Sequence, residues 1–112
     1  EGIAKAHGAI AEVEIKVGYP FLANDVALTE AAILAAKEYV GEENVVELDV
    51  RMTAEDFAYY SQVMPACFYR LGTASADGSN SAGVHNSKFN IDESALLTGA
   101  GLMAYQAYKK LK

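Results

Sequence analysis

The residue best placed to do chemistry is His85, in the segment Gly83–Asn86. This segment closes a stretch rich in Gly, Ser and Asn and precedes the acidic pair Asp92-Glu93. A histidine on such a loop can point at groups supplied from elsewhere, as a metal ligand or a proton carrier near neutral pH. The alternative is a solvated histidine or one held by hydrogen bonds. Spacing alone leaves both open, because a metal site needs three or four converging groups.

A second polar cluster is the pair Glu55-Asp56. Thr53 and Asp56 have the spacing of a capping box, which predicts a helix from Ala54 to about Gln62. Acidic residues favour the first turn of a helix, so a purely structural role for both carboxylates competes with a role beside a cleft.

Two other reactive residue types favour structural interpretations. His7 lies at the end of a short helical segment, where a surface role or an interaction with the helix C-terminus is expected. Cys67 is flanked by Ala66 and Phe68. It is expected to be a small buried hydrophobe, and no nucleophile–base pair surrounds it.

The elements that must position these residues follow from periodicity and capping. Residues 9–17 alternate between apolar and polar side chains, which predicts a half-buried antiparallel strand. In chain order we expect a helical segment over 1–7, that strand, a helix from a Thr29 N-cap to Val40, a strand over 45–48, the helix over 54–62, a strand over 67–71 and a final helix capped by Asp92. Gly99 and Gly101 weaken the final helix by roughly 1 kcal/mol each relative to Ala. We therefore expect its backbone to come close to a neighbour there.

This order of elements predicts the fold class. Helices and strands alternate after residue 20, which indicates an α/β architecture with helices packed on a sheet. The half-polar first strand instead suits an open antiparallel sheet. Turn-forming residues over 18–24 therefore predict a domain boundary.

Composition limits the possible partners and compartments. The chain has 112 residues, nine Lys and Arg against fifteen Asp and Glu, and a net charge of −6. This balance argues against nucleic acid, since no basic surface is available for phosphate. A single cysteine excludes an internal disulfide and fits a reducing compartment. No apolar stretch of about 20 residues and no signal peptide are visible, so we expect a cytoplasmic protein without membrane contact. The chain begins without Met, as if it were the tail of a longer protein.

The order of several motifs is more specific than any one of them. The motifs are Gly18-Tyr19-Pro20 with Asn24-Asp25, Met52 to Tyr60, Pro65 with Phe68 and Leu71-Gly72, and His85-Asn86 with Phe89 and Asp92-Glu93. Together they resemble the C-terminal third of the N-acyl-amino-acid amidohydrolases, the hippurate-hydrolase and auxin-conjugate-hydrolase branch of the aminoacylase and zinc metallocarboxypeptidase family. The resemblance covers essentially all 112 residues. The chain departs from the common pattern at Ala54 and Ala66, where glycine is frequent, and at Ser87, where proline is frequent.

The resemblance implies a domain assignment and a metal site. Family members have a metallopeptidase-type α/β catalytic domain interrupted by a smaller α+β lid, which often mediates dimerisation. Residues 1–19 would be the end of the lid, and residues 20–112 the C-terminal portion of the catalytic domain. His85 would be the last ligand of a two-metal centre, usually zinc. The other ligands and the general base would lie upstream, so no catalytic residue is expected here, and Glu55, Asp56 and Asn86 are carried over only as possible groups beside the cleft.

Two hypotheses about function remain open at this point. The resemblance implies cleavage of the amide bond of N-acyl amino acids or small peptides by a metal-activated water, in a homodimer formed through the lid. The isolated chain would then be inactive. The alternative is a stand-alone, non-catalytic α/β interaction module that self-associates through the exposed edge of strand Ala9–Val17.

Overall fold

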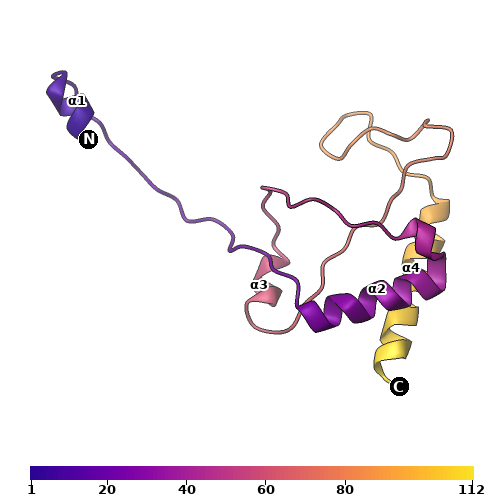
Figure 1. The fold of residues 1–112 in the computed structure, drawn as a ribbon. Helices are drawn as coiled ribbons and strands as arrows, with labels where there is room; N and C mark the ends of the chain where they lie inside the picture. Colours follow the sequence, from indigo (N-terminus) through magenta and orange to yellow (C-terminus); the bar gives the residue numbers. More distant parts are fainter.

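Helices make up all the regular structure of the chain, and the computed structural model describes all residues 1–112. The elements are α1 (Gly2–Ala6), α2 (Val26–Val40), the 3-10 helix η1 (Glu42–Asn44), α3 (Ala58–Ser61) and α4 (Ser94–Lys110). Helices α2 and α4 pack against each other, whereas α1 lies at the far end of an extended segment and contacts no other helix (Figure 1). The expected helices are thus all present, with different bounds.

Helix α2 begins earlier than predicted because Asp25, and not Thr29, is its N-cap. The Asp25 carboxylate accepts a hydrogen bond of 2.8 Å from the backbone N–H of Leu28. The Thr29 hydroxyl lies one turn into the helix and donates to the Asp25 carbonyl at 2.6 Å. Gly41 ends the helix with a φ of 91°, as expected of a glycine after the last turn. Both ends of α2 are therefore fixed by local sequence.

The expectation that the backbone of α4 comes close to its neighbours is confirmed. A Cβ atom at Gly99 would lie 2.7 Å from Cδ2 of Leu71, and one at Gly101 would collide with the hydroxyl of Tyr39. Leu102 is the buried residue of α4. Glycine at these two positions lets α4 contact both the end of segment 67–71 and the last turn of α2.

Helix α3 is shorter than the predicted 54–62 helix, and Thr53 does not cap it. No side chain caps the helix, and the Glu55 carboxylate instead accepts from the backbone N–H of the N-cap residue Phe57 at 3.2 Å. The Phe57 ring packs against that of Phe68, with centroids 5.5 Å apart, and Ala58 is fully buried. Tertiary packing of Phe57 thus sets where the helix begins.

The predicted α/β class, with helices packed on a sheet, is wrong for this chain, because the structure contains no strand. A period-two pattern marks a segment that can pair, but a strand exists only with a hydrogen-bonded neighbour. Residues 9–17, 45–48 and 67–71 have none within the chain. In the third segment a side chain substitutes for the neighbour: the Asn24 amide donates to the Phe68 carbonyl at 2.9 Å and accepts from its N–H at 2.8 Å.

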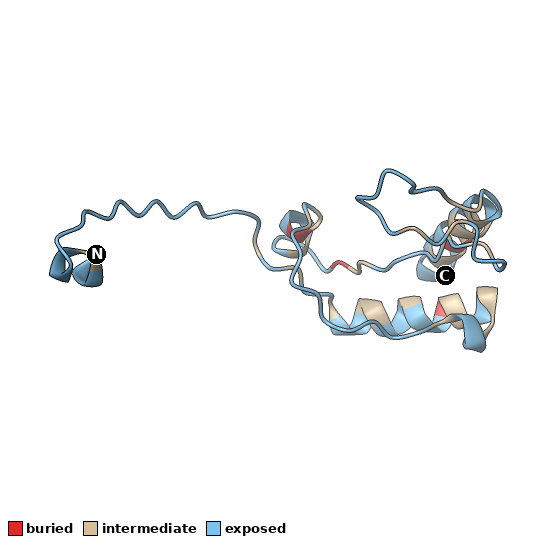
Figure 2. Cartoon of the chain, turned by 90° about the horizontal axis from the view of Figure 1, so that it is seen from above, coloured by how far each residue is buried: buried red, intermediate tan, exposed pale blue.

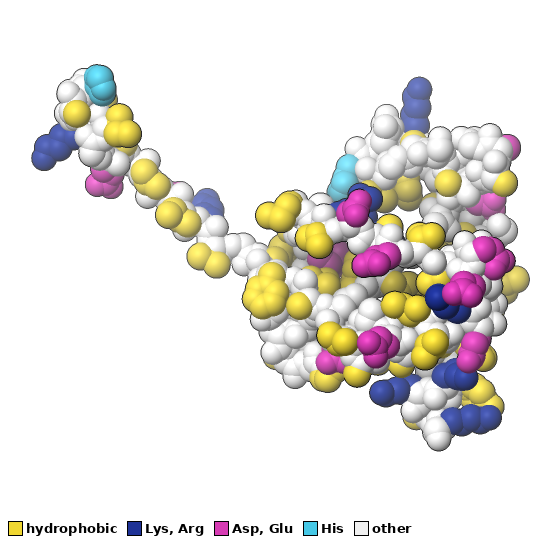
Figure 3. All heavy atoms as spheres, viewed as in Figure 1, with side chains coloured by type: hydrophobic (Ala, Val, Ile, Leu, Met, Phe, Trp, Pro, Cys, Tyr) yellow, Lys and Arg dark blue, Asp and Glu magenta, His cyan; other side chains and the backbone are white.

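Most of the apolar surface is exposed. The buried residues are only Ala35, Ala58, Ala66 and Leu102 (Figure 2). The radius of gyration is 20.3 Å, against about 13 Å for a compact domain of this size. No helix has the length and apolar character that crossing a membrane would require. The helices therefore stabilise one another over a small area, and large hydrophobic side chains face solvent (Figure 3).

Candidate functional site

The loop that carries His85 connects segment 67–71 to α4 and is tied at its ends. The backbone N–H of Asp92 donates to the Thr73 carbonyl at 2.9 Å. Further into the loop, the Asn80 amide donates to the Ile91 carbonyl at 3.3 Å. These bonds hold the two ends of the loop together just before α4, and His85 lies within the loop that they close.

His85 is the one residue other than glycine with a positive φ, 66°. Non-glycine residues rarely occupy this left-handed region, although histidine does so more often than most, and such outliers gather at functional sites. The side chain is exposed and its imidazole makes no hydrogen bond within the chain. The structure therefore excludes a histidine held by hydrogen bonds within the chain, whereas an exposed ring without such bonds agrees both with a solvated histidine and with a ligand for a group outside this chain.

Asn86, predicted as a possible group beside the cleft, shapes the turn that follows His85. Its carboxamide oxygen accepts from the backbone N–H of Lys88 at 2.8 Å, and its carbonyl accepts from that of Phe89 at 2.9 Å. At the α4 end of the loop, hydrogen bonds from the hydroxyl and the backbone N–H of Ser94 lower the pKa of Asp92. The polar residues around His85 therefore fix the backbone and leave the imidazole free.

Glu55 has a local hydrogen-bond partner for its carboxylate, whereas Asp56 has one for its backbone carbonyl. The half-buried Glu55 carboxylate is bonded to the N–H of Phe57, and the Asp56 carbonyl accepts from the N–H of Tyr59. Nowhere in the chain do three His, Cys, Asp or Glu side chains come together as a possible metal site. Since a metal ion needs three or four protein ligands, the residues of this chain do not by themselves fit one, and His85 is a single candidate ligand.

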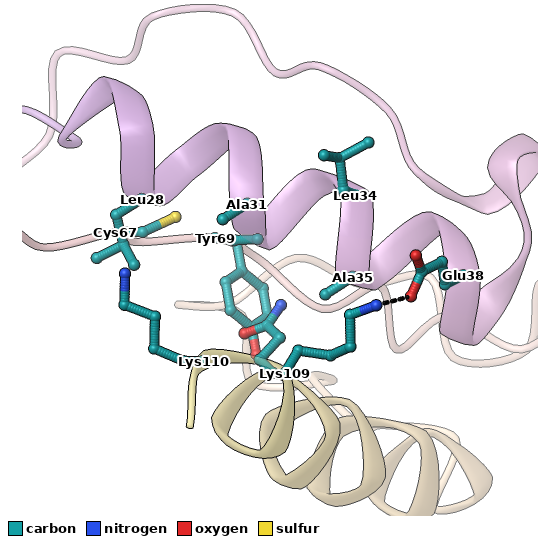
Figure 4. Close-up of a pocket in the computed structure, with 11 residues that line it drawn as sticks. Leu28, Ala31, Leu34, Ala35, Glu38, Cys67, Tyr69, Lys109 and Lys110 are labelled. Atoms are coloured by element: carbon teal, nitrogen blue, oxygen red, sulfur yellow. Dashed lines mark ion pairs between the residues drawn. The ribbon is translucent and has the colours of Figure 1, made fainter. Parts of the chain in front are cut away.

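A cavity of about 360 Å³ lies between α2, α4 and segment 67–71 (Figure 4). Its lining is mostly apolar, and Cys67 and Tyr69 form one wall. Burial raises the pKa of the Tyr69 hydroxyl. The full lining is Leu28, Ala31, Ala32, Leu34, Ala35, Glu38, Cys67, Tyr69, Gln106, Lys109 and Lys110. No nucleophile and base are paired in it, so the cavity has the character of incomplete packing rather than of a catalytic centre.

A charged cluster at the rim of this cavity joins the two long helices, and sequence reasoning missed it. The Glu38 carboxylate accepts from the Tyr105 hydroxyl at 2.8 Å and pairs with the Lys109 ammonium at 2.8 Å. Lys109 and then Tyr105 lower the pKa of Glu38, while Glu38 raises the pKa of both partners. Tyr105 and Lys109 lie one helical turn apart, which is the one sequence signal that they could share a partner.

This cluster predicts a pH dependence for the contact between α2 and α4. Because the pKa of Glu38 is lowered on folding, its stabilisation is complete above the ordinary value of 4.5 and is lost as the pH falls through the folded-state value. Thermal unfolding followed by helical circular dichroism should show a larger decrease in Tm between pH 7 and pH 3 for the native chain than for Glu38→Gln. The difference should be small, since exposed pairs are screened by water. Equal decreases in the two proteins would contradict a role for Glu38, because all other carboxylates are common to both.

Comparisons with known proteins place the chain in context. The model of peptidase family M20/M25/M40 matches residues 4–109. A putative amidohydrolase of Bacillus subtilis is 36% identical over 104 residues, which cover 93% of this chain and 26% of the relative. An IAA-amino acid hydrolase of Arabidopsis thaliana is 34% identical over 98 residues, or 88% of this chain and 22% of the relative. The N-acetyl-L-cysteine deacetylase of B. subtilis is 33% identical over 111 residues, or 99% of this chain and 25% of the relative.

The chain thus spans about a quarter of the length of the curated relatives that it matches. No solved structure matches it. The resemblance to the amidohydrolase family that the motifs suggested is confirmed by the family match and by the names of these relatives.

Proposed function

We propose, on the premise that this chain belongs to peptidase family M20/M25/M40, that it forms part of a metal-dependent amidohydrolase. The reaction would be cleavage of the amide bond of an N-acyl amino acid or a small peptide. The observation that carries this proposal is the family match over residues 4–109, nearly the whole chain. Relatives named as an amidohydrolase, an IAA-amino acid hydrolase and an N-acetyl-L-cysteine deacetylase support amide bonds to amino acids as the substrate class.

Within this enzyme we assign His85 the role of a metal ligand, with zinc as the metal. Its free imidazole and its fixed backbone support this role, because a ligand must present a neutral nitrogen that no group within its own chain occupies. A bound metal ion would polarise the amide carbonyl and lower the pKa of a water. The remaining ligands and the general base would be supplied by the rest of a longer polypeptide, since no three His, Cys, Asp or Glu side chains come together in this chain.

The proposal also assigns the two parts of the chain. Residues 1–19 would end the lid domain, through which two copies of the enzyme dimerise, and residues 20–112 would belong to the catalytic domain. Tyr19 joins the N-terminal segment to the rest of the chain, because its ring lies 5.7 Å from that of Tyr59. This supports a separate role for the residues before it.

A chimera tests the proposed function. Residues 1–112 would replace the aligned segment of the B. subtilis N-acetyl-L-cysteine deacetylase, which is 33% identical. We expect the chimera to release free amino groups from N-acetyl-L-cysteine at a rate within about a hundredfold of the parent enzyme, the loss expected when positioning is imperfect. A chimera that folds, as judged by circular dichroism and gel filtration, but has no activity would contradict the proposal. If it does not fold, the B. subtilis amidohydrolase, at 36% identity, provides a second host.

A further inference from the structure

We infer that Asn86 is a positioning residue, whose side chain keeps the backbone of the neighbouring His85 in its left-handed conformation. With that backbone fixed, the bond from Cα to Cβ of His85 points in one direction, and the ring is offered from one place. The inference rests on the proposed role of His85 as a metal ligand, and it names a second residue on which that role depends.

The conformation of His85 needs support from its neighbours. Its φ of 66° is unfavourable for a residue with a Cβ atom and persists only where the surrounding structure enforces it. His85 takes part in no hydrogen bond, through either its backbone or its ring. Residues 83–90 are all exposed, so close packing of side chains does not enforce the conformation either. The support must therefore come from hydrogen bonds of residues next to His85.

Asn86 is the residue at which such hydrogen bonds begin. Its carboxamide oxygen accepts from the backbone N–H of Lys88 at 2.8 Å, and its carbonyl accepts from the N–H of Phe89 at 2.9 Å. On the other side of His85, the nearest residue that makes a hydrogen bond is Asn80. The turn formed by residues 86–89 is thus the fixed element nearest to His85. Its side-chain bond is the part that a substitution can remove.

The same loop contains a matched turn at Asp77. The carboxylate of Asp77 accepts from the backbone N–H of Ser79 at 2.9 Å, again from the residue two positions further on. Asp77 and Asn86 therefore make the same local bond, but Asp77 lies well before His85 in the chain. If these bonds only stabilised the loop in general, removal of either would have the same effect. Positioning of His85 predicts an effect at Asn86 alone.

Nuclear magnetic resonance of the 112-residue chain tests the positioning itself. A positive φ brings the amide and α protons of a residue close together, so a strong NOE connects them. This NOE of His85 should weaken severalfold in Asn86→Ala, because loss of one exposed hydrogen bond lowers the population of the turn about fivefold. It should be retained in Asp77→Ala and in Asn86→Asp, which keeps an acceptor oxygen. An unchanged NOE in Asn86→Ala, or an equal decrease in Asp77→Ala, would overturn the inference.

The deacetylase chimera tests the consequence for metal binding. Competition titration should give a dissociation constant about fivefold higher in Asn86→Ala for the zinc ion that is lost in His85→Ala, since only molecules with a competent loop bind it. Asn86→Asp should bind zinc at least as tightly as the parent chimera, and Asp77→Ala within about twofold of it. An unchanged constant in Asn86→Ala, or an equal increase in Asp77→Ala, would contradict the inference.

Failure of the proposed function would look different. Zinc binding that is unchanged in His85→Ala would refute the role of His85 as a ligand. The NOE of His85 in the 112-residue chain would still decide whether Asn86 holds its backbone, because that measurement involves no metal.

Discussion

Replacement of His85 by alanine in the deacetylase chimera is expected to lower turnover of N-acetyl-L-cysteine about a thousandfold. A bound metal ion contributes several kcal/mol of transition-state stabilisation, and each ~1.4 kcal/mol changes a rate tenfold. The loss should appear in kcat, measured as release of free amino groups at saturating substrate. The fold should be unchanged, because the His85 side chain is exposed and makes no hydrogen bond.

Two further variants separate loss of a ligand from distortion of the loop. His7→Ala removes the other histidine of the chain, which lies at the end of α1, and should leave turnover unchanged. His85→Gly suits the observed φ of 66° better than alanine does, so it keeps the loop conformation but lacks the imidazole. We expect it to be as inactive as His85→Ala. Substantial activity in His85→Gly would mean that the backbone, and not the ring, matters at this position.

The isolated chain is expected to have no hydrolase activity, even with added zinc. Catalytic zinc sites have three protein ligands, and in this structure no three suitable side chains come together. The purified 112-residue chain with zinc should therefore hydrolyse N-acetyl-L-cysteine no faster than zinc without protein does. A rate within about tenfold of that of the chimera, equivalent to ~1.4 kcal/mol, would refute the assignment of the missing ligands to other segments.

The helices were predictable because their signals are local. Apolar periodicity and the glycine after Val40 indicated α2, and the closely packed Gly99 and Gly101 were anticipated in α4. The starting residues were less predictable. Asp25 is preferred to Thr29 as the N-cap of α2, and the packing of Phe57 against Phe68 moves the start of α3.

The sheet was not predictable from the alternating pattern, because pairing depends on partners that a pattern does not specify. Residues 9–17 have the expected alternation and yet no neighbour, whereas in segment 67–71 the amide of Asn24 takes the hydrogen bonds of Phe68. One side chain can thus make the backbone hydrogen bonds that a neighbouring strand would otherwise make with Phe68. Nothing in the local sequence of either segment indicates this.

The candidate site was predictable only in part. His85 could be selected from its residue type and its loop, but its positive φ and the turn formed by Asn86 depend on the folded backbone. The cluster of Glu38 with Tyr105 and Lys109 joins residues 67 positions or more apart, so only packing of α2 on α4 reveals it. The metal-ligand role of His85 stays a prediction.

The most direct test of the central claim, that the imidazole of His85 binds a catalytic metal, is the metal content of the chimera and of its His85→Ala variant. Elemental analysis after removal of loosely bound ions should find two equivalents of metal per chain in the chimera. The variant should hold at most one. Mutation of groups that hydrogen-bond to metal ligands lowers metal affinity by roughly 10–100-fold, and loss of a direct ligand should lower it further. Two equivalents in both proteins would contradict the account.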